Sequence, residues 1–173
     1  MRYAFVSNNV AIEVVSTDPH IVFVPHYASQ FIEVPDNVQP GWVLSGGNWQ
    51  APAVDVAALR AQHWEAIKTE RDRRTQSGGY QAAGKWFHSD TFSRTQQMGL
   101  VMMGAGIPGG LQWKTMDGSF VTMTQTLASQ VFSAAAASDA ALFSHAEQIK
   151  AVMEADPVNF SLAGQTWPAV FGE

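Results

Sequence analysis

Residues 85–123, KWFHSDTFSRTQQMGLVMMGAGIPGGLQWKTMDGSFVTM, carry the densest structural signals in this chain. Residues 86–87 predict a short strand, and either Ser89 or Asp90 can accept a hydrogen bond from the free amides that begin a helix. The apolar pattern then predicts that helix over about residues 91–103, with its second half buried nearly all round. Glycines and a proline follow it, so the stretch continues into a turn.

The sequence predicts one hairpin before this helix and one hairpin after it. Residues 111–114 and 119–123 are strand-like, and the Asp-Gly pair between them tolerates the positive φ angles of a tight turn. Residues 80–82 and 85–87, with Gly84 between them, predict the other hairpin. Aromatic residues at successive strand positions favour one apolar layer shared with the helix. We therefore expect four aromatic side chains to be largely buried: Trp86, Phe87, Trp113 and Phe120.

Longer helices flank the two hairpins. The spacing of apolar residues predicts one helix over about residues 54–76. A second predicted helix covers about residues 125–155, a run without glycine or proline, and Thr124 is its natural cap. A break at Ser138-Asp139 is the alternative, because Asp139 could cap a separate helix.

The first 50 or so residues predict a separate small β unit, followed by a linker at Ala51-Pro52-Ala53. Gly46-Gly47 allows a tight reversal between two aromatic-bearing segments. The predicted fold class is therefore α+β: a β-meander module over 1–52, and a helix–hairpin–helix–hairpin–long helix module over 53–173. The other strands expected in the first module are residues 3–6, 10–15, 21–24 and 30–34.

Four short runs carry a resemblance to a known family. They are WFHSD at 86–90, GLVMMG at 99–104, IP at 107–108 and QWKTMDGSF at 112–120. With these runs, the chain resembles an uncharacterised domain family of tailed-bacteriophage and prophage proteins, commonly encoded in tail and tail-fibre regions. The resemblance covers roughly the last two thirds of the chain. It implies a role in the virion by association and brings no catalytic residues.

The first module resembles the N-terminal or linker pieces of phage tail-fibre and tail-fibre-assembly proteins. Such pieces have a proline-spaced strand followed by Gly-Trp, a glycine turn, an aromatic residue and a proline. They occur in more than one type of tail protein, so the resemblance does not select one type. The matching residues are Pro35, Gly41, Trp42, Gly46, Gly47, Trp49 and Pro52.

Composition excludes several other classes of protein. The formal net charge is -5 and only 10 Lys and Arg are present, which argues against a nucleic-acid partner. With no cysteine, disulfides and thiolate zinc sites are excluded. The N-terminal apolar patch is too short for a signal peptide. The longest apolar stretch, residues 98–111, is interrupted by glycines and is too short to cross a bilayer, so we expect a soluble protein without membrane insertion.

No catalytic or cofactor motif stands out. His88 with Asp90 could suggest a metal pair or an acid and base, but residues of these types commonly satisfy backbone groups where a strand meets a helix. No metalloprotease, nucleophile-elbow or phosphate-loop motif occurs. We therefore expect no enzyme activity, no cofactor and no metal. A tail-associated glycan hydrolase stays a weak alternative, with Asp90 and Asp117 as its acids.

The favoured function is a non-enzymatic structural component of a phage tail, such as a tail-fibre or baseplate adaptor. The alternative is a tail-fibre assembly chaperone. The expected location is the virion, and the expected partners are other tail proteins and further copies of this chain. A strip of small residues lets another helix approach closely, and C-terminal aromatics could dock on a neighbour. The interface candidates are Ala134, Ala135, Ala136, Ala137, Phe160, Trp167 and Phe171.

Overall fold

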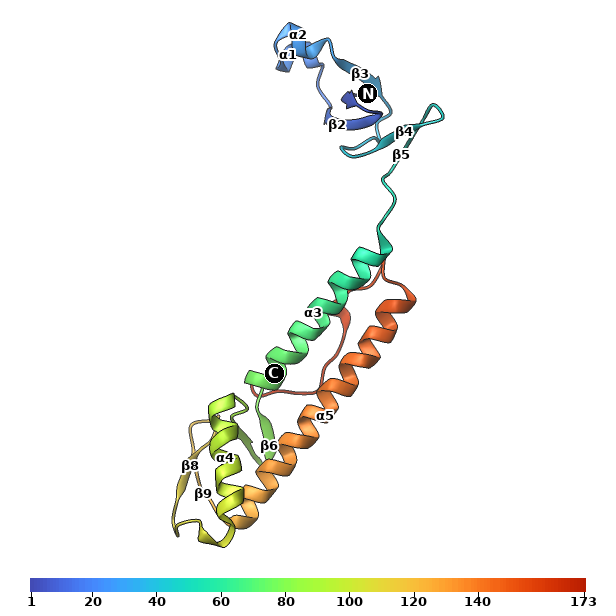
Figure 1. The fold of residues 1–173 in the computed structure, drawn as a ribbon. Helices are drawn as coiled ribbons and strands as arrows, with labels where there is room; N and C mark the ends of the chain where they lie inside the picture. The colour runs from blue at the N-terminus through green and yellow to red at the C-terminus, as the bar shows by residue number, and fades with distance from the viewer. The chain divides into compact units, whose positions relative to one another are not determined.

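The structure, a computed structural model, describes residues 1–173 and contains two compact units, Met1–Asp55 and Val56–Glu173. Figure 1 shows the course of the chain through each unit. The predicted α+β fold class is confirmed, with a small sheet in the first unit and helices with hairpins in the second. The first unit ends at Asp55, three residues after the boundary predicted at residue 52.

The first unit is built on one antiparallel sheet with the strand order β3-β1-β2-β4-β5. The turn between β1 and β2 is formed by Asn8 and Asn9, whose φ angles are 50° and 62°. Asparagine tolerates this left-handed backbone better than most residues, so the pair closes the hairpin at low cost. The strands are β1 Arg2–Ser7, β2 Val10–Val15, β3 Phe31–Val34, β4 Val43–Ser45 and β5 Asn48–Gln50.

The strand expected at residues 21–24 is wrong. Single helical turns replace it, α1 Pro19–Val22 and α2 Pro25–Ala28, each with its proline at the first helical position. Proline fixes φ near the helical value and lacks only an amide that a first turn leaves unpaired, so it begins helical turns readily. The turns bring Phe23 and Tyr27 to Phe31 of the sheet, with ring centroids 5.1 and 5.3 Å apart.

Two long helices form the body of the second unit. The helices α3 Val56–Ser77 and α5 Gln125–Ala155 lie side by side and run in opposite directions (Figure 1). Ile67 of α3 is fully buried against α5 residues, including Ala146 and Met153. The break considered at Ser138-Asp139 does not occur, because α5 is one continuous helix.

The rest of the unit packs at the N-terminal half of α5. It comprises the hairpin of β6 Tyr80–Ala82 and β7 Lys85–Phe87, the helix α4 Thr91–Met103, and the hairpin of β8 Gln112–Lys114 and β9 Phe120–Thr122. A short 3-10 turn, η1 Gly104–Gly106, follows α4, and a second, η2 Leu162–Gly164, lies after α5. The core of this part comprises Tyr80, Ala82, Phe87, Leu100, Met123, Ala128, Val131 and Ala135.

The four aromatic residues expected in this core differ in burial. Phe87 is 0% exposed, and Trp86 and Trp113 are half-buried. Phe120 is 62% exposed, so its predicted burial is wrong. The reason is the register: Trp113 pairs with Val121, and Phe120 lies on the neighbouring pair, whose side chains point to the opposite face of the hairpin.

The expected burial of the second half of α4 is also wrong. Leu100 is buried, but Met98 and Met103 are each 48% exposed and Met102 is 81% exposed. The helix packs on α5 along one face, which covers only part of its apolar surface.

A glycine at the start of β6 offers a test of the packing. Gly79 has φ of +73°, and an added Cβ would lie 2.3 Å from the Met116 sulfur and 2.9 Å from the Phe87 carbonyl oxygen. Gly84 has a similar φ of +75° but open space around it. We expect Gly79→Ala to lower the free energy of unfolding by about 2 to 4 kcal/mol and Gly84→Ala by only about 1 kcal/mol. Urea denaturation measures both, and equal losses would contradict the close approach at Gly79.

Candidate functional site

Arg94 fixes the position of α4 in the second unit. Its guanidinium makes a bidentate ion pair with Asp139 of α5, at 2.6 and 2.8 Å. The same side chain donates to the carbonyl oxygens of Ser89, at 2.6 Å, and Thr75, at 3.0 Å. The hydrogen bond with Asp139 raises the pKa of Arg94, so the group stays charged. One side chain thus joins α4 to α5, to the last turn of α3 and to the loop before α4.

That loop is held by further hydrogen bonds. Asp90 accepts from the amide and the hydroxyl of Ser93, which identifies it as the N-cap of α4. Ser89, the other cap candidate, instead accepts from the Gly79 amide at 2.9 Å. The Gln97 amide group donates to the His88 carbonyl oxygen at 3.1 Å. Residues 88–90 are therefore rigidly attached to both neighbouring elements.

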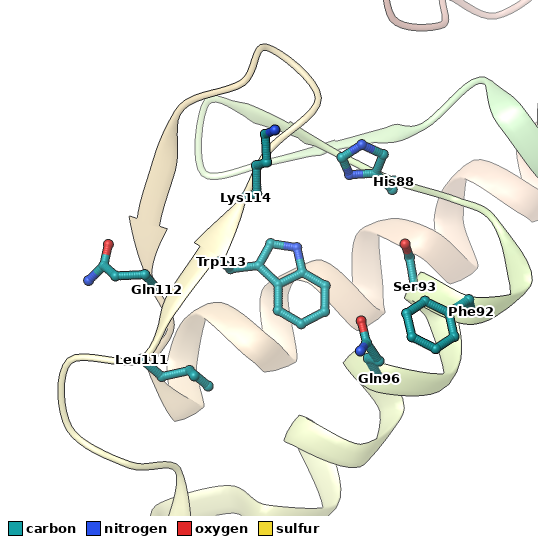
Figure 2. Close-up of a pocket in the computed structure, with 8 residues that line it drawn as sticks. All are labelled: His88, Phe92, Ser93, Gln96, Leu111, Gln112, Trp113 and Lys114. Atoms are coloured by element: carbon teal, nitrogen blue, oxygen red, sulfur yellow. The ribbon is translucent and has the colours of Figure 1, made fainter.

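An open groove of about 420 Å³ lies between α4 and β8. Figure 2 shows the Trp113 ring reaching from β8 toward α4, which presents Phe92, Ser93 and Gln96 to it. Strand and helix thus form the two walls of the groove, and Trp113 lies between them. The lining residues are His88, Phe92, Ser93, Gln96, Leu111, Gln112, Trp113 and Lys114.

Several polar side chains in this groove have no partner within the chain. No hydrogen bond or ion pair engages the side chains of His88, Gln96 and Lys114. None of the lining residues carries a carboxylate. The groove therefore offers free donors beside an aromatic surface, an arrangement typical of binding sites that combine apolar contact with a few polar contacts.

The two acids considered for glycan hydrolysis already have partners. The Ser93 hydroxyl and amide hold the pKa of Asp90 below its ordinary value. Asp117 accepts from Lys85 at 2.8 Å, and this bond, with further donors in its own turn, holds the pKa of Asp117 well below its usual range. A general acid must stay protonated near neutral pH, which requires a raised pKa. Both carboxyls are therefore unsuited to that role.

The alanine strip is divided between the core and the surface. Ala135 is 8% exposed and belongs to the core, so it is not available to a partner, and Ala134 packs beside it. Ala136 and Ala137 lie on the exposed side of α5. The chain's own core therefore covers one side of the strip, and Ala136 and Ala137 keep exposed surface on the other side.

The C-terminal aromatics pack mainly on their own chain. Phe160 and Trp167 are partly buried against the cluster formed by Ile67 and its α5 neighbours, so this chain itself covers part of the surface that was expected to dock on another subunit. Phe171 is 38% exposed, and its ring lies 6.2 Å from that of Trp86. The apolar character of this segment is thus explained by folding back on α3 and α5.

Arg74 anchors this returning segment to α3. It is 8% exposed, pairs with Glu70 at 2.6 Å, and donates to the Pro168 carbonyl oxygen at 3.0 Å. It also pairs with Glu173 at 2.9 Å. The Phe171 amide donates to the Gly78 carbonyl oxygen at 2.8 Å, beyond the end of α3. Arg74 therefore has a structural role at the end of α3.

Glu70 should make the stability of this unit depend on pH. Hydrogen bonds, first from Arg73 and then from Arg74, lower the pKa of Glu70 from 4.5 to about 2. A depressed carboxyl contributes its full stability above pH 4.5 and loses it as the pH falls toward 2. We expect Glu70→Gln to cost on the order of 2 kcal/mol at neutral pH and to flatten the acid limb of the stability curve. Urea denaturation between pH 7 and pH 2 measures this, with the exposed Glu65→Gln as control; an unchanged acid limb would contradict it.

The first unit carries an exposed apolar patch that the sequence pattern did not predict. Ile21, Val22 and Val24 are 78%, 54% and 70% exposed. The sequence did not predict this patch because residues 21–24 were assigned to a strand, and a strand would have turned alternate side chains toward the core. The proline that begins each turn was the available signal for helical structure here.

No three or more His, Cys, Asp or Glu side chains are grouped so that they could hold a metal ion. No helix combines the length and the apolar character that a bilayer span requires. Among protein families, the model described as a domain of unknown function (DUF4376) matches residues 58–165. No curated protein and no solved structure matches the chain.

Proposed function

The chain belongs to the DUF4376 family, and from this premise we propose that it is a non-enzymatic structural component of a bacteriophage tail, an adaptor associated with the tail fibre or baseplate. The family description names no function. The phage setting rests on the resemblance of the runs between residues 86 and 120 to tail-region proteins.

The observation that carries the adaptor role is that each of two separately packed units has its own exposed apolar surface. In the first unit this surface is the patch of Ile21, Val22 and Val24. In the second it includes Met98 and Met102, which lie one turn apart on α4 and are 48% and 81% exposed. Contiguous exposed apolar side chains typically mark contacts with other proteins. Two units with two such surfaces suit a protein that joins two neighbours.

The chemistry of the second unit supports a non-enzymatic role. Its groove lacks a carboxylate, and the pKa values of Asp90 and Asp117 are held low by hydrogen bonds. A glycan hydrolase needs one carboxyl that stays protonated and a second that is ionised across a sugar-binding cleft. Neither candidate acid meets the first requirement.

Further copies of this chain are among the partners we propose, because tail proteins assemble with rotational symmetry. Of the candidate interface residues, Ala136, Ala137 and Phe171 are the exposed ones, and another subunit could cover them. We propose these three, together with the two apolar surfaces, as the contacts inside a particle.

A tail-fibre assembly chaperone is the second candidate, favoured by one observation. The C-terminal segment packs on its own chain, so it gives no reason to expect permanent burial against a neighbour. A chaperone must also tolerate exposure of its binding surface after it releases its client, as the patch in the first unit does here.

Quantitative mass spectrometry of purified particles distinguishes the two candidates. The adaptor predicts this chain in a fixed ratio to the major tail proteins. Abundance in the infected-cell lysate with absence from the particles would overturn the proposal in favour of the chaperone.

Substitutions inside and outside the apolar patch of the first unit test whether that patch contacts another protein in the particle. Ile21→Asp with Val24→Asp should lower recovery in particles at least about tenfold without a change in melting temperature, because both side chains are exposed. Thr17→Asp, an exposed change nearby, is the control and should leave recovery unchanged. Equal recovery of all three proteins would contradict a contact at this patch.

A further inference from the structure

We infer that the groove between α4 and β8 binds an extended polypeptide segment of a partner protein, which adds a strand to the free edge of β8. The inference deepens the proposed function, because it names one surface through which an adaptor would hold a neighbour.

The backbone of β8 has one unpaired edge. The strand pairs only with β9, in a two-stranded sheet. The Thr115 amide donates to Ser119 and the Met123 amide donates to Leu111, which fixes the residues whose backbone groups face β9. Alternation then turns the amide and carbonyl groups of Gln112 and Lys114 away from β9. These four groups have no partner in the chain and form a template for another strand.

The groove follows this edge. Four consecutive residues, 111–114, line it, whereas a groove across one face of the strand would be lined by alternate residues only. The opposite wall is α4, as Figure 2 shows. At one end the Met116 amide donates to the Trp86 carbonyl oxygen at 2.9 Å, which joins the two hairpins there. A strand edge facing a helix is the arrangement that β-augmentation uses to bind peptides.

The side chains of the groove define the chemistry of the partner segment. Phe92 is 72% exposed and Trp113 is half-buried, so together they offer contact to one large apolar or aromatic residue. His88 and Lys114 are free, and no carboxylate lines the groove, in a chain whose net charge is -5. An acidic residue in the segment would complement Lys114. A saccharide could stack on Trp113, but it would leave the line of free backbone groups unused.

The test uses the full chain and a yeast-displayed library of random heptapeptides. Selection should enrich peptides that share an aromatic or large apolar residue and an acidic residue. A synthetic peptide of the enriched sequence is then titrated by calorimetry. Replacing alternate backbone amides of that peptide with N-methyl amides should weaken binding at least about tenfold, because strand addition depends on these donors.

Two variants of the protein form a matched pair. Lys114 and Phe120 are cross-strand partners whose amides both point away from the hairpin ladder, so proline at either position leaves the β8–β9 hydrogen bonds intact. Lys114→Pro should weaken binding at least about tenfold, and Phe120→Pro less than about twofold. Lys114→Gln separates the lost charge from the lost amide and should retain more affinity than the proline variant.

These binding measurements test the groove on the isolated protein and do not require phage particles. No enrichment over cells that display no peptide would overturn it. So would equal losses for the two proline variants, or binding that N-methylation leaves unchanged. Binding of a glycan array in place of peptides would assign the groove to saccharides. Whether the chain is found in virions is a separate measurement, so either proposal can fail alone.

Discussion

Replacing Arg94 with alanine should lower the free energy of unfolding of the second unit by about 2 to 4 kcal/mol. The change removes a bidentate ion pair with Asp139 and two hydrogen bonds to backbone carbonyl oxygens, and it leaves the partly buried carboxylate without its cation. It also removes the guanidinium that lies 5.4 Å from the centre of the Tyr80 ring. The groove should be affected too, because Arg94 holds α4 in place.

Two further variants make this expectation specific. Arg94→Lys should recover less than half of the loss, because one ammonium group cannot reproduce the planar donors of a guanidinium. Lys68→Ala removes a surface pair with Glu65, whose side chain is 71% exposed, and a contact of the ammonium group over the Trp64 ring, and it should cost less than about 1 kcal/mol. Denaturant unfolding of the four proteins measures these differences. A loss at Arg94 no larger than that at Lys68 would contradict its role as an anchor.

Phe87→Ala should cost about 3 to 5 kcal/mol. The side chain is fully buried in the cluster that joins β6, β7, α4 and α5, and its removal opens a cavity among Tyr80, Leu100 and Val131. The surrounding elements are held by Arg94 and by the tight contact at Gly79, so the site has little freedom to collapse.

Alanine substitutions of the neighbouring aromatic residues should lower the free energy of unfolding by smaller amounts, in the order of their burial. Trp113→Ala should cost about 1 to 3 kcal/mol, less than full burial would imply, because the ring is half-buried and borders the groove. Phe120→Ala should change stability by less than about 0.5 kcal/mol, because its side chain is 62% exposed. Thermal and urea unfolding test the order, and a cost at Phe120 equal to that at Phe87 would contradict the register of the hairpin.

Local chemistry allowed most elements to be predicted from the sequence. The helices α4 and α5 have the predicted bounds, because Asp90 and Thr124 are strong caps and glycine or Asp-Pro follows each helix. The two hairpins of the second unit were predictable for the same reason, since Gly84 and Gly118 adopt the positive φ angles that their turns require.

What the sequence did not predict depends on tertiary contacts. The face to which Phe120 points follows from the register, and Met102 is exposed because only one side of α4 is covered. The C-terminal aromatics were read as docking material because nothing local shows that residues near 160 and 167 return to α3.

The candidate groove could not be predicted from the sequence either. His88, Gln96 and Lys114 come from three separate elements, and their lack of partners is visible only in space. An unpaired strand edge is also not a property of the residues themselves, because it depends on which strands the fold places beside β8.

We propose that this chain joins two neighbours within a phage tail, and a cryo-electron-microscopy reconstruction of the purified particle is the sharpest test of this role. We expect density for this chain in which residues 1–55 and 56–173 contact different protein subunits, with Ile21 and Val24 covered in one contact and a partner segment lying along β8 in the other. A particle reconstruction without this chain, or one in which both units touch the same neighbour or only solvent, would contradict the adaptor role.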